Sequence, residues 1–141
     1  MNYDPSAVFL GKTSGVTVTT TDGLANDGFA GDHDNVNEDV ENLTGTSFDD
    51  SLSVSAGSLQ GSAGNDTLRI VNGGGQEYGA SGSNDLRAGP ASTLLRRLGN
   101  DTLFSADQVE DHDNCGKGPG DVVTVDAHDH WSNCETVHLT P

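Results

Sequence analysis

The sequence contains little positive charge and few apolar residues. Of its 141 residues, six are Lys or Arg and 22 are Asp or Glu, so the formal net charge is −16. Binding of nucleic acid or of an anionic membrane surface requires clustered basic side chains, and the composition argues against both partners. Leu, Ile, Val and Phe together number 29, close to the fraction below which highly charged chains stay disordered. Cations are therefore the partners that such a chain needs in order to fold.

Long apolar runs are also absent. No stretch approaches the length of a transmembrane helix, and the first residues have neither the basic start nor the apolar centre of a signal peptide. We therefore expect no membrane insertion. The missing signal fits a mature or excised chain as well as export by a route without one. Helical periodicity is nearly absent too, and only residues 93–98 could form one or two helical turns, or else a strand.

The sequence shows no catalytic motif. No Ser, Cys or His arrangement has the spacing of a catalytic site, so we expect no enzyme activity. Histidines and aspartates alternate near the C-terminus without forming a recognised zinc motif. We expect exposed turn residues there rather than a zinc or acid–base cluster, namely His112, His128, His130, Asp111, Asp113 and Asp129.

The sequence does contain a short repeated pattern of glycine, Asp or Asn, and an apolar residue. The clearest copy is residues 61–69, its core recurs at 99–103, and looser copies lie at 45–53, 79–87 and 118–123. The polar positions are separated by 16, 18, 17 and 20 residues, and they are Asp50, Asp66, Asn84, Asp101 and Asp121. The apolar positions lie two residues later with the same steps, and they are Leu52, Leu68, Leu86, Leu103 and Val123.

Each part of the pattern has a structural consequence. Glycines permit positive φ and tight turns, and the apolar residue fits a short strand that faces a narrow core. We therefore predict an all-β fold, a right-handed parallel β-helix or β-roll solenoid with coils of about eighteen residues. The polar positions should lie in a row along one edge above an apolar ladder. The opposite edge, at 72–75 and 88–91, has no carboxylate, so we expect the metal row on one edge only.

The charge of this row favours a bound cation. Two carboxylates at the strand spacing of about 4.8 Å repel each other by roughly 3.5 kcal/mol at an effective dielectric constant near 20. A cation between them turns this repulsion into attraction, and Asp supplies a hard oxygen ligand suited to calcium. The alternative is a metal-free solenoid with ordinary Asn-Gly and Asp-Gly turns.

The repeated pattern resembles the calcium-binding nonapeptide GGxGxDxUx of RTX (hemolysin-type) proteins, in which U is apolar. The resemblance extends from about residue 16 to residue 139. It implies a secreted calcium-binding module with ligands along the predicted row. Phe48 replaces the second glycine of one copy and Asn84 replaces an Asp, so Asp66 and Asp101 are the best candidate ligands.

An acidic, glycine-rich stretch precedes the repeats at residues 22–36. Its spacing does not fit an EF-hand in either register. We predict a second cation site with Asp27, Asp32 and Asp34 as ligands. The alternative is a solvated acidic loop.

Cys115 and Cys134 are the only cysteines and lie 19 residues apart. One coil plus one residue would place them on adjacent strands, within the Cα distance of a disulfide. A disulfide would indicate an oxidising, extracellular compartment, while a reduced pair is also compatible with the sequence.

The two ends decide whether coils of different molecules could stack. Pro141 cannot donate a backbone hydrogen bond, and residues 9–11 could fold over the strand-like segment 16–21. Both ends are therefore partly blocked, which favours a calcium-loaded monomer or a small oligomer, and end-to-end self-association is the alternative.

Together these features predict a single domain. It consists of an N-terminal cap with an acidic loop (1–44), the repeats (45–126) and a closing coil (127–141). The expected function is that of a secreted, extracellular calcium-binding module, with Ca²⁺ as cofactor, that folds when calcium binds. One alternative is a self-assembling structural or adhesive filament subunit. Another is an ice-binding solenoid, although a regular rank of Thr residues is missing.

Overall fold

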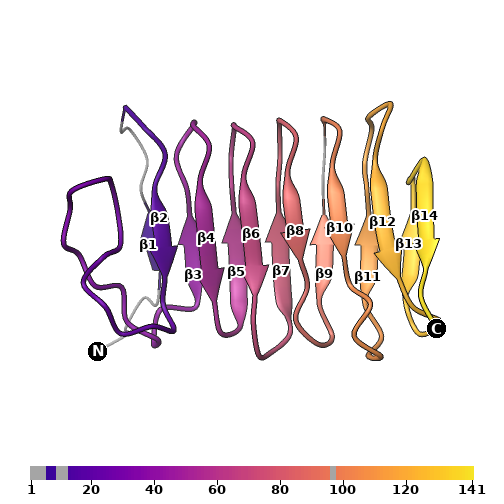
Figure 1. Ribbon diagram of the computed structural model, residues 1–141, viewed down its shortest axis with the longest axis horizontal. Helices are drawn as coiled ribbons and strands as arrows, with labels where there is room; N and C mark the ends of the chain where they lie inside the picture. Colours follow the sequence, from indigo (N-terminus) through magenta and orange to yellow (C-terminus); the bar gives the residue numbers. More distant parts are fainter. Residues whose placement is uncertain (1–5, 9–12, 96–97) are drawn as a thin grey trace.

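The computed structural model describes residues 6–8, 13–95 and 98–141, and all regular secondary structure in these residues is β-strand. The strands form a two-sided solenoid whose coils follow one another along a single long axis (Figure 1). The segment 93–98, considered above as a short helix, begins with a strand. Residues 9–12, which include the whole of the predicted end cover at 9–11, and residues 96–97 lie outside the described residues. No helix that could span a membrane occurs in the part of the chain that the structure describes.

Two parallel sheets form the sides of the solenoid. The odd sheet contains, in spatial order, β1 (Ser6–Val8), β3 (Asn42–Thr44), β5 (Gly57–Gln60), β7 (Gly75–Tyr78), β9 (Thr93–Leu95), β11 (His112–Asn114) and β13 (His130–Ser132). The even sheet contains β2 (Thr17–Thr19), β4 (Ser51–Val54), β6 (Thr67–Ile70), β8 (Asp85–Arg87), β10 (Thr102–Phe104), β12 (Val122–Val125) and β14 (Thr136–Leu139). Each coil contributes one strand to each sheet, which confirms the predicted fold class.

The apolar ladder lies on the inner face of the even sheet. Its members pair directly with one another from strand to strand, and all are at most 1% exposed: Leu52, Leu68, Leu86, Leu103 and Val123. The unequal steps between them do not disturb this register, because the turns absorb the differences. The turn between β4 and β5 has two residues, whereas the turn between β10 and β11 has seven.

The inner face of the odd sheet is less apolar. The positions that pair with one another there are Leu43, Leu59, Glu77, Leu94, Asp113 and Trp131. The Glu77 side chain is fully buried, and its Oε1 accepts a hydrogen bond from the N–H of Ile70 at 2.9 Å. Two of the inner positions are therefore carboxylates, and most of the apolar core comes from the even sheet.

Residues 20–41 form a cap that covers the N-terminal end of the solenoid (Figure 1). Thr17 and Gly28 exchange two backbone hydrogen bonds of 2.9 and 2.8 Å, so the cap pairs with the outer edge of β2. Phe29, Val36 and Val40 pack against the core. The cap thus covers the outer edge of β2 and packs on the apolar core at this end, while β1 pairs with β3 and with no other described strand.

A disulfide joins the last two coils. Cys115 and Cys134 are bonded, with their Cα atoms 5.1 Å apart, and Cys115 is fully buried. The predicted placement on adjacent coils is confirmed. In the chain-entropy model, a bridge that closes a loop of this length stabilises the fold by about 3 kcal/mol, which ties the terminal coil to the rest.

Candidate cation site along one edge

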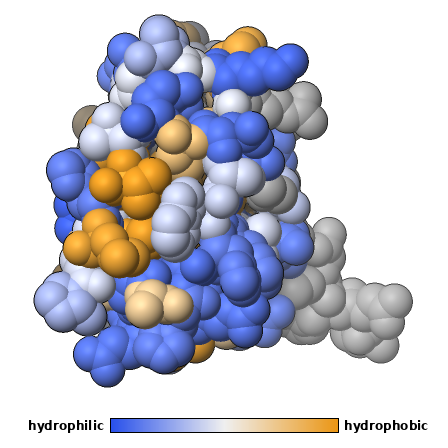
Figure 2. All heavy atoms as spheres, turned by 90° about the vertical axis from the view of Figure 1, so that its right-hand side faces the viewer, coloured by the Kyte–Doolittle hydropathy of each residue, from blue (hydrophilic) through white to orange (hydrophobic). Residues whose placement is uncertain are grey.

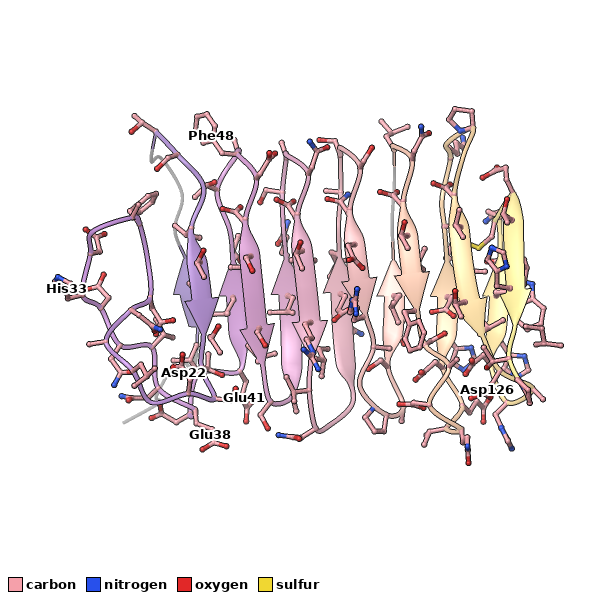
Figure 3. All side chains as sticks on the ribbon, viewed as in Figure 1. Asp22, His33, Glu38, Glu41, Phe48 and Asp126 are labelled. Carbon is pink, nitrogen blue, oxygen red and sulfur yellow. A yellow bond between two sulfur atoms is a disulfide. The ribbon has the colours of Figure 1, made fainter. Side chains whose placement is uncertain are left out.

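The turns of the solenoid form two edges. The turns that follow odd-numbered strands make up the Asp66 edge, where Figure 3 labels Phe48, and the turns that follow even-numbered strands make up the Asp111 edge, where it labels Asp126. The predicted ligand row belongs to the Asp66 edge. Each of its members directly precedes a strand of the even sheet, because the strand begins as soon as the turn has closed.

The structure brings the five predicted side chains of this edge into one row. All of them are buried, with exposed fractions of 0 to 4%: Asp50, Asp66, Asn84, Asp101 and Asp121. Burial of carboxylates at this density is unusual, because a buried charge loses its hydration and requires hydrogen bonds or an opposite charge.

A hydrogen-bond ladder connects the row. In each coil the Oδ1 atom accepts the backbone N–H of the residue that holds the same place one coil earlier. Asp66 accepts from Asp50 at 3.0 Å, Asn84 from Asp66 at 2.9 Å and Asp101 from Asn84 at 2.8 Å. The same contact continues from Asp101 to Asp121 at 2.9 Å. The ladder therefore fixes the spacing of the coils at this edge, and an amide oxygen serves as well as a carboxylate.

Glycine is required where the chain passes the row. A Cβ at Gly61 would lie 2.1 Å from Oδ2 of Asp66, and a Cβ at Gly45 would lie 2.2 Å from Oδ2 of Asp50. Real Cβ atoms do not approach oxygen so closely, so no other residue fits at these positions. The first glycine of the repeat thus admits the carboxylate, whereas Gly64, with φ of 125°, makes the turn itself.

Asp66 has the clearest electrostatic imbalance of the row. Its Oδ2 atom is buried and has no hydrogen-bond partner. Burial raises the pKa of its carboxyl from 3.8 to about 6, the hydrogen bond from the Asp50 N–H opposes this, and the charges of Asp50 and Asp49 add to it. The position therefore favours a proton or a cation over a bare negative charge.

Side chains alone do not complete a metal site in this structure. Among residues 6–8, 13–95 and 98–141, no group of three or more His, Cys, Asp or Glu side chains is arranged to hold a metal ion. The buried row at the Asp66 edge has one Asp or Asn side chain per coil. A calcium ion takes six to eight oxygen ligands, and backbone carbonyls are common among them, so any ion at this edge would need turn carbonyls as well.

The Asp111 edge, where the metal row was not expected, also carries buried carboxylates. Asp111 and Asp129 are buried there in the last two coils. They form a second ladder, in which Asp111 accepts the N–H of Ser92 and Asp129 accepts the N–H of Asp111. Burial raises the pKa of Asp111 to about 7, and its Oδ2 atom is buried without a hydrogen-bond partner. The segments 72–75 and 88–91, on which the expectation rested, lie in earlier coils.

A signal for this second ladder was present in the sequence. Asp111 and Asp129 each precede an inner position of the odd sheet by two residues, Asp113 and Trp131. Asp66 precedes Leu68 by the same offset. The repeat pattern requires an apolar residue two places after the Asp or Asn. It therefore did not detect Asp111, because the residue two places later is Asp113.

The histidine-rich region also differs from the expectation. His112 and His130 are exposed, but they lie on paired strands and their rings stack at 5.2 Å. The aspartates of this region, by contrast, are buried rather than exposed. Ser105 Oγ donates to Asp113 Oδ2 at 2.7 Å, and the backbone N–H of His128 lowers the pKa of Asp126.

The second predicted cation site lies in the N-terminal cap, where Figure 3 labels Asp22, His33 and Glu38. Asp27 is buried, and its two oxygens accept the N–H groups of Thr19 at 2.7 Å and Val36 at 2.6 Å. It therefore holds the cap to β2. Asp32 and Asp34 are exposed, and their Oδ2 atoms lie within 3.5 Å of the point where a Gly28 Cβ would be. The structure brings these two carboxylates together on the surface, while Asp27 has a structural role.

Comparison with known proteins adds no relative. No family model, no curated protein and no solved structure matches the chain. The resemblance to the RTX nonapeptide therefore rests on the residues of this sequence alone.

Proposed function

We propose that the chain is a secreted calcium-binding β-roll module that gains its fold when calcium binds along the Asp66 edge. The observation that carries the proposal is the Asp66 carboxylate, which is buried in a row of side-chain oxygens and has one oxygen without a hydrogen-bond partner. The oxygen is buried away from water and no N–H group donates to it, so a cation is the partner that would balance its charge.

Asn84 explains why hydrogen bonding alone does not account for the carboxylates. Its amide oxygen occupies the same place in the ladder as the neighbouring carboxylates. A metal-free scaffold would therefore be better served by Asn at the Asp66 level, since adjacent carboxylates about 4.8 Å apart repel by roughly 3.5 kcal/mol. Asp50 differs, because its Oδ2 also accepts the N–H of Thr46 at 2.6 Å, which an amide nitrogen could not do. Carboxylates at four of the five levels favour a role for the negative charge.

The donor set favours calcium over a transition metal. The Asp66 edge supplies carboxylate, amide and carbonyl oxygens, whereas zinc and copper sites are typically built with imidazole or thiolate ligands. The two cysteines are joined in a disulfide, which fits an oxidising, extracellular compartment. We include secretion in the proposal for this reason.

Ice binding has less support than calcium binding. The outward positions of the even sheet form a rank in which Thr alternates irregularly with other residues: Thr17, Ser51, Thr67, Asp85, Thr102, Val122 and Thr136. A flat ice-binding face requires a regular rank. We therefore do not propose this function.

A calcium titration followed by circular dichroism tests the proposal. The wild-type chain should change from largely disordered in chelator to β-rich in calcium. Asp66→Asn keeps the ladder acceptor but removes the charge, so it should weaken calcium affinity tenfold or more, which corresponds to about 1.4 kcal/mol. The matched control is Asp85→Asn, one residue beyond the row, where the side chain is partly exposed and forms a 3.4 Å ion pair with Arg87.

Three outcomes would contradict the proposal. The first is a full β-rich spectrum in excess chelator with no further change on adding calcium. The second is an equal loss of affinity in the Asp66 and Asp85 variants, which would make the effect one of net charge. The third is an unchanged affinity in Asp66→Asn, which would assign this carboxylate to the ladder alone.

A further inference from the structure

The two ends of the solenoid differ in the structure. At the N-terminal end the cap pairs with β2 and packs against the core. The C-terminal end consists of β13 and β14, which pair with β11 and β12 on one side and with no other described strand. We call the outer surface of these two strands the C-terminal face. Pro141 follows β14, and it does not cover Val137 and Leu139 of this strand, which are exposed.

The C-terminal face exposes residues that would be core residues in any other coil. Val137 pairs with Val123 of the apolar ladder, and Leu139 pairs with Val125. Val123 and Val125 are fully buried, whereas Val137 is 39% and Leu139 is 64% exposed, and Trp131 is 40% exposed. Figure 2, which faces this end, shows apolar side chains gathered within an otherwise hydrophilic surface.

The backbone of β14 also has an open side. The N–H groups of Thr136 and Thr140 donate to Asp121 and Val125 at 3.0 and 2.8 Å. Backbone groups of successive residues in a strand point to opposite sides. The N–H and C=O groups of Val137 and Leu139 therefore point away from β12, toward the open end, where a further strand could pair.

Charge separates the two ends. Residues 20–41 contain seven Asp or Glu and no Lys or Arg, whereas residues 127–141 contain only Asp129 and Glu135, with three histidines. Asp129 is buried, and Glu135 Oε2 accepts the N–H of Asp121 at 3.0 Å. Two C-terminal faces can therefore approach each other with little repulsion, whereas two caps cannot.

We propose that two copies of the chain associate through their C-terminal faces, with β14 of one copy against β14 of the other across a two-fold axis. Such an interface is self-complementary and closed. At both far ends the cap pairs with the outer edge of β2 and hinders further addition there, so the expected product is a dimer and not a filament. The proposal concerns the terminal coil and does not depend on which cation folds the protein.

The size of the face sets the strength of the contact. A four-residue strand spans about 13 Å and the two sheets are about 10 Å apart, so with side chains and turns the dimer buries on the order of 1,000 Å² in total. This area is at the lower limit of specific interfaces. We therefore expect a dissociation constant in the micromolar range, and measurements must extend to several hundred micromolar.

Sedimentation equilibrium of folded protein tests the dimer with a matched pair of variants. Leu139→Asp places a charge on the C-terminal face, and Leu24→Asp places the same charge on the cap, where Leu24 is 56% exposed. Leu139→Asp should raise the dissociation constant at least tenfold, while Leu24→Asp should leave it unchanged. Circular dichroism of both variants checks that each remains folded.

The single tryptophan gives a second readout that needs no variant. Trp131 is the only tryptophan of the chain and belongs to the C-terminal face. Its emission in the wild-type protein should shift to shorter wavelength as the protein concentration rises and the face becomes covered. Sedimentation that shows a monomer at every concentration would overturn the proposal, as would open-ended polymers or a loss of association in Leu24→Asp.

Discussion

Raising the pH should destabilise the metal-free protein. The pKa of Asp66 is about 6 and that of Asp111 about 7, against the ordinary value of 3.8, and burial is the main cause in both cases. A group whose pKa is raised by folding favours the folded state in its protonated form. This contribution is fully present below pH 3.8 and is lost as the pH rises through about 6 for Asp66 and about 7 for Asp111.

The size of the effect follows from the two pKa values. Between pH 5 and pH 8, the free energy of unfolding should fall by about 1 kcal/mol through Asp66 and by about 3 kcal/mol through Asp111. The sum of about 4 kcal/mol is a large part of the stability of a typical domain, which is about 5 to 15 kcal/mol. Burial also raises the pKa of Asp129, which acts in the same direction. The lowered pKa of Asp126 acts below pH 3.8 and does not affect this interval.

Urea unfolding of metal-free protein at about pH 5 and about pH 8, followed by circular dichroism with the disulfide intact, measures this difference. The double variant Asp66→Asn/Asp111→Asn should show a much smaller pH dependence, because it removes both titrating groups and keeps both ladder acceptors. Asp85→Asn should retain the wild-type dependence. If the wild-type protein is already unfolded at pH 8, the β-rich spectrum should appear as the pH falls toward 5.

A result of the opposite sign would refute the reasoning. Metal-free protein that is equally stable or more stable at pH 8 would show that hydrogen bonds outweigh burial at both carboxylates. Calcium supplies a control, since a bound cation should reverse the trend by favouring the ionised carboxylates at high pH.

Two further predictions concern the Asp66 edge. Gly82→Ala should destabilise the folded state by roughly 3 kcal/mol or more, because φ is 115° and the new Cβ would lie 1.9 Å from the Gly64 carbonyl oxygen. Gly31→Ala, with φ of 97° but nothing within 4 Å, should cost only about 1 kcal/mol, and thermal unfolding compares the two. Asn84→Asp should lower the stability in chelator and strengthen calcium binding by calorimetry, because it adds a carboxylate and removes the Nδ2 donation to Asp101 at 3.3 Å. An unchanged or weaker calcium affinity would contradict the proposed ligand row.

The central part of the fold could be predicted from the sequence, because each coil of a solenoid contacts only the coils next to it. Each coil buries its inner residues against the next coil, so a recurring apolar position with a glycine turn before it leaves little choice of register. Leu52, Leu68 and Leu86 could be assigned to one ladder from their spacing alone. The disulfide between adjacent coils was predicted in the same way, from the spacing of the two cysteines.

Burial of the carboxylates was not predictable in the same way. Asp66 and Asp111 differ from surface aspartates only through the neighbouring coils, which exclude water and supply N–H groups. The row at the Asp111 edge also escaped prediction, because its turns have unequal lengths and its inner position is Asp113. A pattern that requires glycine and an apolar residue does not detect such a ladder.

The sequence by itself determined the coil length, the apolar ladder, the row at the Asp66 edge and the proximity of the two cysteines, because these depend on contacts between neighbouring repeats. Only the tertiary structure decided which end carries a cap. Val137 and Leu139 have the pattern of core residues, and no local feature shows that no further described strand packs against them. Whether an apolar residue is core or surface depends on the next layer, and the last coil has none among the described residues.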